Sequence, residues 1–169
     1  MSTSPRSVTA RTSRGTVITV AVAVVVLAFD QLTKTWAVNA LDDGHDIDLF
    51  WTLRFHLTFN GGMAFSQGRG LGPVIGVIAI VVIAVLLVSL RRSGSTLGAV
   101  AVGLVVGGAT GNIVDRLFRS GRDGFLSGEV IDFVDLQWWP VFNVADAAVV
   151  IGGGLLLLST ALTPGPQRP

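Results

Sequence analysis

Two aspartates near the C-terminal end of the chain, Asp132 and Asp146, have the residue type and the surroundings of a catalytic pair. Both stand beside apolar stretches of membrane length, where an ionised carboxylate is costly unless another group pairs with it or uses it. The turn-prone Trp-Trp-Pro sequence at 138–140 allows the two side chains to face each other. Two facing carboxylates that share one proton supply a base and an acid. The pattern therefore favours an aspartic hydrolase within a membrane or at its edge.

The composition indicates an integral membrane protein. Of the 169 residues, 50% are hydrophobic and only 14% are charged, whereas a soluble domain carries about 25% charged residues. The chain contains no cysteine, which excludes a thiol protease, a disulfide scaffold and cysteine metal sites. The net charge of +1 gives no reason to expect a nucleic-acid partner.

Four apolar segments lie at 17–38, 71–90, 97–118 and 143–162. Each has about the 20 residues that cross a bilayer as a helix. The first segment could alternatively be a cleavable signal peptide, with a basic start and a small-residue site at 38–40, but Asp30 and Lys34 do not suit that interpretation. We therefore expect a mainly α, integral membrane protein with four transmembrane helices.

The arginines predict how these helices are oriented. They flank the first segment, form the link between the second and third, and follow the fourth: Arg6, Arg11, Arg14, Arg91, Arg92 and Arg168. Positive segments stay in the cytoplasm, so we expect both termini inside and the long connections 39–70 and 119–142 outside. The domain at 16–162 then lies between disordered cytoplasmic tails at 1–15 and 163–169.

The first outer connection has the pattern of a small β-sheet. Residues 49–59 alternate aromatic or aliphatic side chains with other residues, which is typical of a strand, and Asn60-Gly61-Gly62 is typical of a turn. We expect a small extracytoplasmic β-sheet between helices 1 and 2, lying on the outer face of the membrane.

Four carboxylates fall at one depth, just below the outer surface of the membrane: those of Asp30, Asp115, Asp132 and Asp146. No carboxylate falls at the midplane of the membrane. This distribution suits a site that a substrate enters sideways from the outer leaflet. It suits a transporter or channel poorly, because a pathway needs polar groups at several depths. A scaffold without chemistry is a third class, and it should tolerate loss of both Asp132 and Asp146.

Other polar residues have structural explanations beside the functional ones. Asp30 and Lys34 are spaced as a local ion pair, with Lys34 reaching the headgroups; alternatively, Asp30 orients a neighbouring group. The small residues 107–111 allow close approach of another helix. Asn112 and Asp115, one turn apart, then form either the end of a packing motif or a polar platform in which Asp115 fixes Arg116. We expect Arg119 to face the headgroups.

The sequence Asn143-Val-Ala-Asp146 has the form of a helix cap. Asn is a favoured N-cap, and an acid three residues later suits a capping box. Capping alone would explain both residues, but it is compatible with catalysis, because a capped Asp146 and a drier Asp132 would divide base from acid. We expect Asp135, in the same connection, to be solvated.

Other kinds of chemistry find little support. His45 and His56 have no ligand spacing between them, so we expect no metal. A serine–lysine protease would have to use Lys34, and no serine has an evident partner. We also expect no cofactor.

Five motifs together resemble the lipoprotein signal peptidases, the type II signal peptidases of bacteria. They occur in the family's order over about residues 16–162: Asp30-Gln-x-Thr-Lys34, Asn60-x-Gly62-x-Ala64-Phe65-Ser66, Gly111-Asn112-x-x-Asp115-Arg116, Val-Ile-Asp132-Phe133 and Phe142-Asn143-x-Ala145-Asp146. The chain departs from many relatives at residues 61–63, which bears on the shape of the substrate groove.

The resemblance implies a membrane aspartic endopeptidase that removes the signal peptide from diacylglyceryl-modified prolipoproteins, just before the lipidated cysteine. It implies that Asp132 and Asp146 are the catalytic pair. It further implies residues that bind substrate or support the site, namely Asp30, Lys34, Asn60, Asn112, Asp115, Arg116, Asn143 and Ala145. The enzyme would work as a monomer among the lipids of the bacterial inner membrane, with its site near the outer leaflet.

Overall fold

The computed structural model describes residues 6–62, 71–90, 95–119, 121 and 123–162. Within them the elements are α1 (Arg6–Leu41), β1 (Ile47–Phe50), β2 (Leu53–Asn60), α2 (Gly72–Leu90), α3 (Thr96–Phe118), β3 (Val130–Asp135) and α4 (Val144–Ala161). The helices are long and apolar enough to cross a membrane, which confirms the predicted fold class. Three groups of predictions lie outside the described residues: the terminal segments 1–5 and 163–169, the motif residues 64–66, and Arg91, Arg92 and Arg168.

The first helix is longer than the sequence pattern predicts. It begins at Arg6, so the prediction of a disordered segment through residue 15 is wrong for residues 6–15. Helix formation has a costly nucleus and cheap propagation. The apolar segment supplies the nucleus, and the helix then extends through the polar residues before it.

Helix α3 is the centre of the bundle and packs against α1, α2 and α4. Its glycines permit this close approach, as the sequence predicts. A Cβ atom on Gly107 would lie 2.7 Å from the carbonyl oxygen of Ala23 in α1, and one on Gly108 would collide with the carbonyl oxygen of Ala145 in α4. The bundle therefore brings polar groups of three helices within hydrogen-bonding reach of one another.

The three-stranded sheet is antiparallel, in the order β1-β2-β3. The prediction of one strand over residues 49–59 is wrong in detail, because a turn at Trp51 (φ 51°) divides this stretch between β1 and β2. The third strand comes from the connection between α3 and α4 and pairs Asp132 with Thr58 of β2. This strand has only six residues, and its pairing with β2 is fixed by contacts far apart in the sequence.

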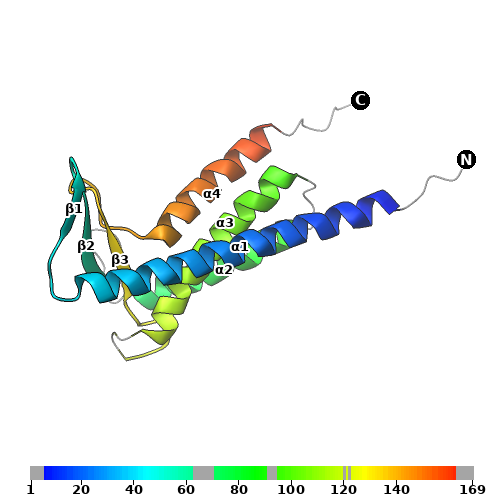
Figure 1. Cartoon of the computed structure of the whole chain (residues 1–169). Helices are drawn as coiled ribbons and strands as arrows, with labels where there is room; N and C mark the ends of the chain where they lie inside the picture. Colours follow the sequence, from blue (N-terminus) through cyan, green and yellow to red (C-terminus); the bar gives the residue numbers. More distant parts are fainter. Residues whose placement is uncertain (1–5, 63–70, 91–94, 120, 122, 163–169) are drawn as a thin grey trace, which may run out of the picture.

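The sheet lies across one end of the helices, as Figure 1 shows; α1 begins and α4 ends at the opposite end of the bundle. One face of β3 packs on α1, where Ile131 and Phe133 form a buried cluster with Ala37 and Leu41. Because side chains alternate along a strand, Asp132 points to the other face. The packing of its two neighbours thus aims Asp132 toward the mouth of the bundle.

Candidate active site

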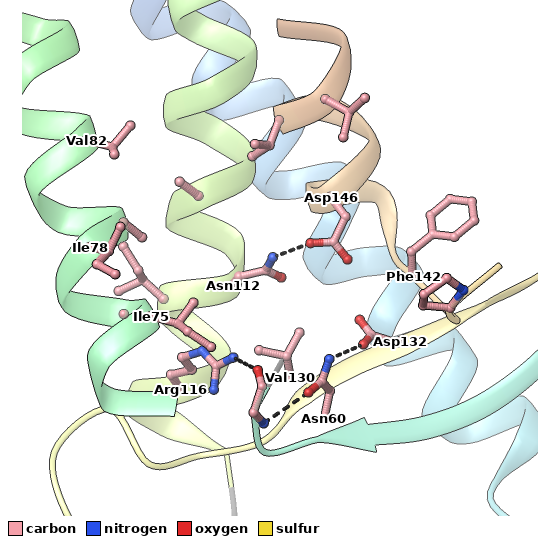
Figure 2. Close-up of a pocket in the computed structure, with 18 of the residues that line it drawn as sticks. Asn60, Ile75, Ile78, Val82, Asn112, Arg116, Val130, Asp132, Phe142 and Asp146 are labelled. Carbon is pink, nitrogen blue, oxygen red and sulfur yellow. Dashed lines mark hydrogen bonds between the residues drawn. The ribbon is translucent and has the colours of Figure 1, made fainter. Parts of the chain in front are cut away.

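A cavity of about 570 Å³ opens between α2, α3, α4 and the sheet. Its walls along the helices are apolar and include Ile75, Ile78 and Val82 of α2 and Val149 of α4. Its polar groups gather at the end nearest the sheet, as Figure 2 shows: Asn60, Asn112, Arg116, Asp132 and Asp146. The cavity is therefore a long apolar groove with a cluster of charged and amide groups at one end.

Both aspartates predicted as the pair line this cavity. Figure 2 shows that their carboxylates face the same space from opposite sides. Asp132 is 2% exposed. Its Oδ2 accepts a hydrogen bond of 3.0 Å from Asn60 Nδ2, and its Oδ1 accepts one of 2.6 Å from Asn143 Nδ2. The Oδ1 atom of Asp146 accepts a bond of 2.8 Å from Asn112 Nδ2. Side-chain amides thus fix the orientation of both carboxylates.

The environment of Asp132 favours its protonated form. Burial raises the pKa of Asp132 to about 7, and the negative charge of Asp146 acts in the same direction. The hydrogen bonds from Asn60 and Asn143 lower this pKa but do not offset burial. Asp132 can therefore carry a proton near neutral pH, in keeping with the drier position expected of it.

Asn143 caps α4 and also contacts Asp132, so capping and site construction coexist. Its Oδ1 accepts the N–H of Asp146 at 2.9 Å, and Asp146 Oδ2 accepts the N–H of Asn143 at 3.3 Å, which completes the predicted capping box. The backbone N–H of Ala145, also in the first turn of α4, donates to Asp30 Oδ1 at 2.9 Å. The start of α4 is therefore held by a carboxylate of α1 as well as by its own cap.

Lys34 does not reach the headgroups. It is fully buried, and its Nζ lies 2.9 Å from Asp30, 2.8 Å from Asp115 and 2.9 Å from Asn112 Oδ1. The predicted i, i+4 ion pair is present, but the close approach of α3 adds a second carboxylate from that helix. The interpretation of Lys34 as an interfacial residue is therefore wrong, and the alternative, in which Asp30 orients a neighbour, agrees with its bond to Ala145.

Two further polar residues differ from the predicted arrangement. Arg116 does not pair with Asp115; it donates to the carbonyl oxygen of Gly62 at 3.1 Å, and its buried Nη1 has no hydrogen-bond partner among the described residues. Arg119, predicted to face headgroups, pairs with Asp115 at 2.8 Å instead. The helical period explains this exchange, because residues at i and i+4 share a face whereas adjacent residues do not.

Sequence reasoning missed the role of Gln31. Its Nε2 lies 3.2 Å from Asp30 Oδ2, 3.1 Å from Asp115 Oδ1 and 3.2 Å from the carbonyl oxygen of Gly111. Its position between Asp30 and Lys34 in the first motif was the available signal. Gln31 joins α1 to α3 beside the buried ion pairs.

Asp135 is not solvated, contrary to the prediction. It is 5% exposed, pairs with Arg54 at 2.7 Å and accepts the N–H of Gln137 at 2.6 Å. Strand β3 extends to Asp135, and the register places it opposite Arg54 of β2. Asp135 does not line the cavity, so the two aspartates of this strand have separate surroundings.

Neither histidine lines the cavity. His45 contacts Asp43, and His56 lies 2.7 Å from Asp46. Across the part of the chain that the structure describes, no three histidine, aspartate or glutamate residues gather where they could hold a metal ion.

Comparison with known proteins identifies the family. The family model described as "Signal peptidase (SPase) II" matches residues 22–162. Curated relatives called lipoprotein signal peptidase include those of Mycolicibacterium smegmatis, 43% identical over 88% of this chain, and Mycobacterium tuberculosis, 44% identical over 81%. The matches cover 65% and 67% of those relatives, so the chain spans about two thirds of their length.

A solved structure supports the same relationship. A bacterial membrane enzyme determined by the in meso method at 2.3 Å resolution superposes with a TM-score of 0.73 and 26% identity, covering 89% of this chain and 93% of that one. With its membrane-length helices, the chain is a bacterial membrane protein. Because the family model spans most of its length, the chain belongs to the signal peptidase II family.

Proposed function

We propose that this protein is a membrane aspartic endopeptidase that removes the signal peptide from prolipoproteins whose lipobox cysteine carries diacylglycerol. The bond cleaved lies just before that cysteine. The observation that carries the proposal is the presence of two carboxylates, from β3 and α4, at the polar end of one apolar cavity. The lipoprotein signal peptidases among its relatives supply the reaction class.

In this proposal Asp146 is the base and Asp132 is the acid. Both carboxylates accept two N–H groups, and those of Asp146 come from Asn112 and from the backbone of Asn143. What distinguishes Asp146 is its place in the first turn of α4, where the helix dipole favours an ionised carboxylate. Asp132, with its raised pKa, holds the shared proton. Asp146 takes a proton from a water molecule as that water attacks the scissile carbonyl, and Asp132 gives its proton to the carbonyl oxygen. As the C–N bond breaks, Asp146 gives the proton that it took from water to the leaving nitrogen, and Asp132 recovers its proton from a hydroxyl of the tetrahedral intermediate as the carboxyl group forms. No cofactor takes part.

The shape of the cavity supports a signal peptide as the substrate. Its apolar length, lined by Ile75, Ile78 and Val82, suits the apolar helix of such a peptide. At the polar end, the buried Nη1 of Arg116 has no partner in the described part of the chain, and an unpaired buried donor is costly. We propose that this Nη1 atom donates hydrogen bonds to the substrate carbonyl groups next to the scissile bond. Asn60, which bonds Asp132 and the turn at Gly62, holds the same end of the groove.

The proposed setting is the bacterial cytoplasmic membrane, with both termini inside and the sheet outside. One observation that supports this orientation is that α1 begins and α4 ends at the same end of the bundle. The distribution of arginines supplies the direction. The polar end of the cavity then lies at the outer leaflet, where a diacylglyceryl cysteine is held. One membrane domain over residues 16–162, acting as a monomer among membrane lipids, contains every residue of the proposed site.

The test is cleavage of a defined substrate. Purified protein in lipid vesicles is incubated with a diacylglyceryl-modified prolipoprotein, and the products are identified by mass spectrometry. The expected products are a free signal peptide and a protein that begins with the lipidated cysteine. Cleavage at another bond, or none at all by folded protein, would overturn the proposal.

A further inference from the structure

Lys34 is connected to the proposed base through one amide. Its Nζ donates to Asn112 Oδ1 at 2.9 Å, and Asn112 Nδ2 donates to Asp146 Oδ1 at 2.8 Å. Lys34 itself does not line the cavity. Any effect that it has on the reaction must therefore pass through the groups that it contacts or through its charge.

The orientation of the Asn112 amide determines what Asp146 receives. An ammonium group only donates hydrogen bonds, so it requires the amide oxygen, and the NH₂ group is then turned toward Asp146. The reversed amide would place NH₂ against the ammonium and its oxygen against the carboxylate. A second donor, Asn143 Nδ2, lies 3.2 Å from the same Asn112 oxygen, but Asn143 has other acceptors in Ile131 O and Asp132 Oδ1.

The charge that acts on Asn112 is itself held rigidly. Asp30 of α1 and Asp115 of α3 both contact the ammonium of Lys34. Asp30 is fixed by the N–H of Ala145, and Asp115 is fixed by Arg119 and by the N–H of Ile131. These contacts join α1, α3, α4 and β3 around one buried cation, more support than an ion pair between two helices requires.

We propose that Lys34 is a positioning residue that fixes the Asn112 amide with its NH₂ toward Asp146, so that Asp146 is kept as the acceptor and hence as the base of the pair. The proposal deepens the proposed function and rests on it. Without Lys34 the amide can reverse when Asp146 holds the shared proton, and the division of the pair into base and acid is lost.

The first experiment compares two variants that each remove one cation bound to Asp115. Lys34→Met removes the cation that contacts Asn112, and Arg119→Met removes the one that does not. For Lys34→Met we expect kcat to fall on the order of tenfold to a hundredfold, as for a misplaced catalytic group, with KM nearly unchanged because the cavity walls are intact. Arg119→Met should keep kcat within about threefold of the original. Equal losses in the two variants would contradict the proposal.

The pH profile supplies a readout that a general loss of structure would not move. Asp132 faces the charges of Asp146 on α4, Lys34 on α1 and Arg116 on α3, and the Lys34 charge lowers the pKa of Asp132. Lys34→Met should therefore move the alkaline limb of kcat/KM to higher pH, whereas Arg119→Met should move it less. A Lys34→Met profile that is lower but not displaced would mean that Lys34 is only structural.

A double variant keeps the test valid if Lys34→Met fails to fold. Lys34→Met with Asp30→Asn removes one charge of each sign, and the amide oxygen of the introduced asparagine can still accept the N–H of Ala145. Asp115 keeps its pair with Arg119. We expect this double variant to fold, to have the same reduced kcat as Lys34→Met, and to keep the alkaline limb of kcat/KM at the higher pH. Recovery of full activity would overturn the proposal, since Lys34 would then serve only to neutralise Asp30.

These outcomes separate the inference from the function on which it rests. Failure of the original protein to cleave the lipidated substrate would refute the proposed function. Full cleavage by Lys34→Met, alongside an inactive Asp146→Asn variant, would refute only the role of Lys34.

Discussion

At the scale of single residues, the two aspartates of the proposed site differ in what surrounds them. Asp132 lies on a strand between two core residues, and its pKa is raised to about 7. Asp146 lies in the first turn of α4, where the dipole of the helix and its N–H groups favour negative charge. Two carboxylates in unlike surroundings can divide the roles of acid and base.

Replacement of either aspartate by asparagine should abolish cleavage. Asn keeps the shape of the side chain but cannot exchange the proton, so Asp132→Asn and Asp146→Asn should each lose several orders of magnitude in kcat. The rate is measured with the lipidated prolipoprotein, and membrane insertion is checked separately. The matched control is Asp135→Asn, on the same strand but outside the cavity, which should retain most of the activity. Substantial cleavage by either variant of the pair would exclude these roles.

The raised pKa of Asp132 predicts the pH dependence. The ordinary value of 3.8 is raised to about 7, so Asp132 holds its proton below about pH 7 and loses it above. If it is the acid, kcat/KM should fall as the pH rises through about 7; the two carboxylates titrate as a pair, so this limb belongs to both. Because the bond from Asn60 lowers the pKa of Asp132, Asn60→Ala should move the limb to higher pH. A flat profile from about pH 5 to 9 would contradict the assignment of Asp132 as the acid.

At the scale of the elements, sequence patterns predicted what is local and missed what is long-range. The membrane helices follow from apolar length, and the cap of α4 follows from the spacing of Asn143 and Asp146. Strand β3 was not predicted, because its six residues are specified by pairing with β2. The contacts of Lys34 and Arg119 were also missed: the bond from Lys34 to Asn112 spans 78 residues, and only the packing of α1 on α3 creates it.

The glycines of α3 make this packing testable. A Cβ on Gly111 would collide with the Asp30 carboxylate, which would displace it from Ala145 N–H and from Lys34. Gly111→Ala should therefore destabilise the protein by about 1–3 kcal/mol, the usual cost of overpacking. On α4, Gly153 has open space around it, so Gly153→Ala should be neutral or stabilising by up to about 1 kcal/mol. Unfolding of both variants is measured in the same detergent, and similar shifts in the midpoint would argue against the close contact at Gly111.

At the scale of the whole molecule, the described residues place the carboxylates and amides of the site at the sheet end of the bundle and leave apolar walls along the rest of the cavity. Large apolar side chains cover the outward faces of α2 and α4, such as Val81, Ile151 and Leu157. A lipid-facing bundle with its polar groups at one end suits a reaction on a substrate held in the bilayer. Sequence composition predicted the spans, because apolar length alone decides whether a helix can cross a bilayer. The location of the site near the outer leaflet stays a prediction.

The proposed location of the site makes lipidation of the substrate a requirement for efficient cleavage. The acyl chains contribute about 0.8 kcal/mol per buried methylene to membrane binding, and they hold the modified cysteine at the depth of Asp132 and Asp146. An unmodified cysteine loses this placement, and a shift of about 1 Å can cost roughly a hundredfold in rate. The measurement compares one prolipoprotein with and without its diacylglycerol, in the same vesicles and with the same enzyme. A soluble peptide that spans the cleavage site serves as the control for access to the aspartates without any anchor, and it should be cleaved no faster than the unmodified prolipoprotein. Equal rates for the modified and unmodified proteins would mean that the signal-peptide helix alone sets the depth of the scissile bond, even if both aspartates proved catalytic.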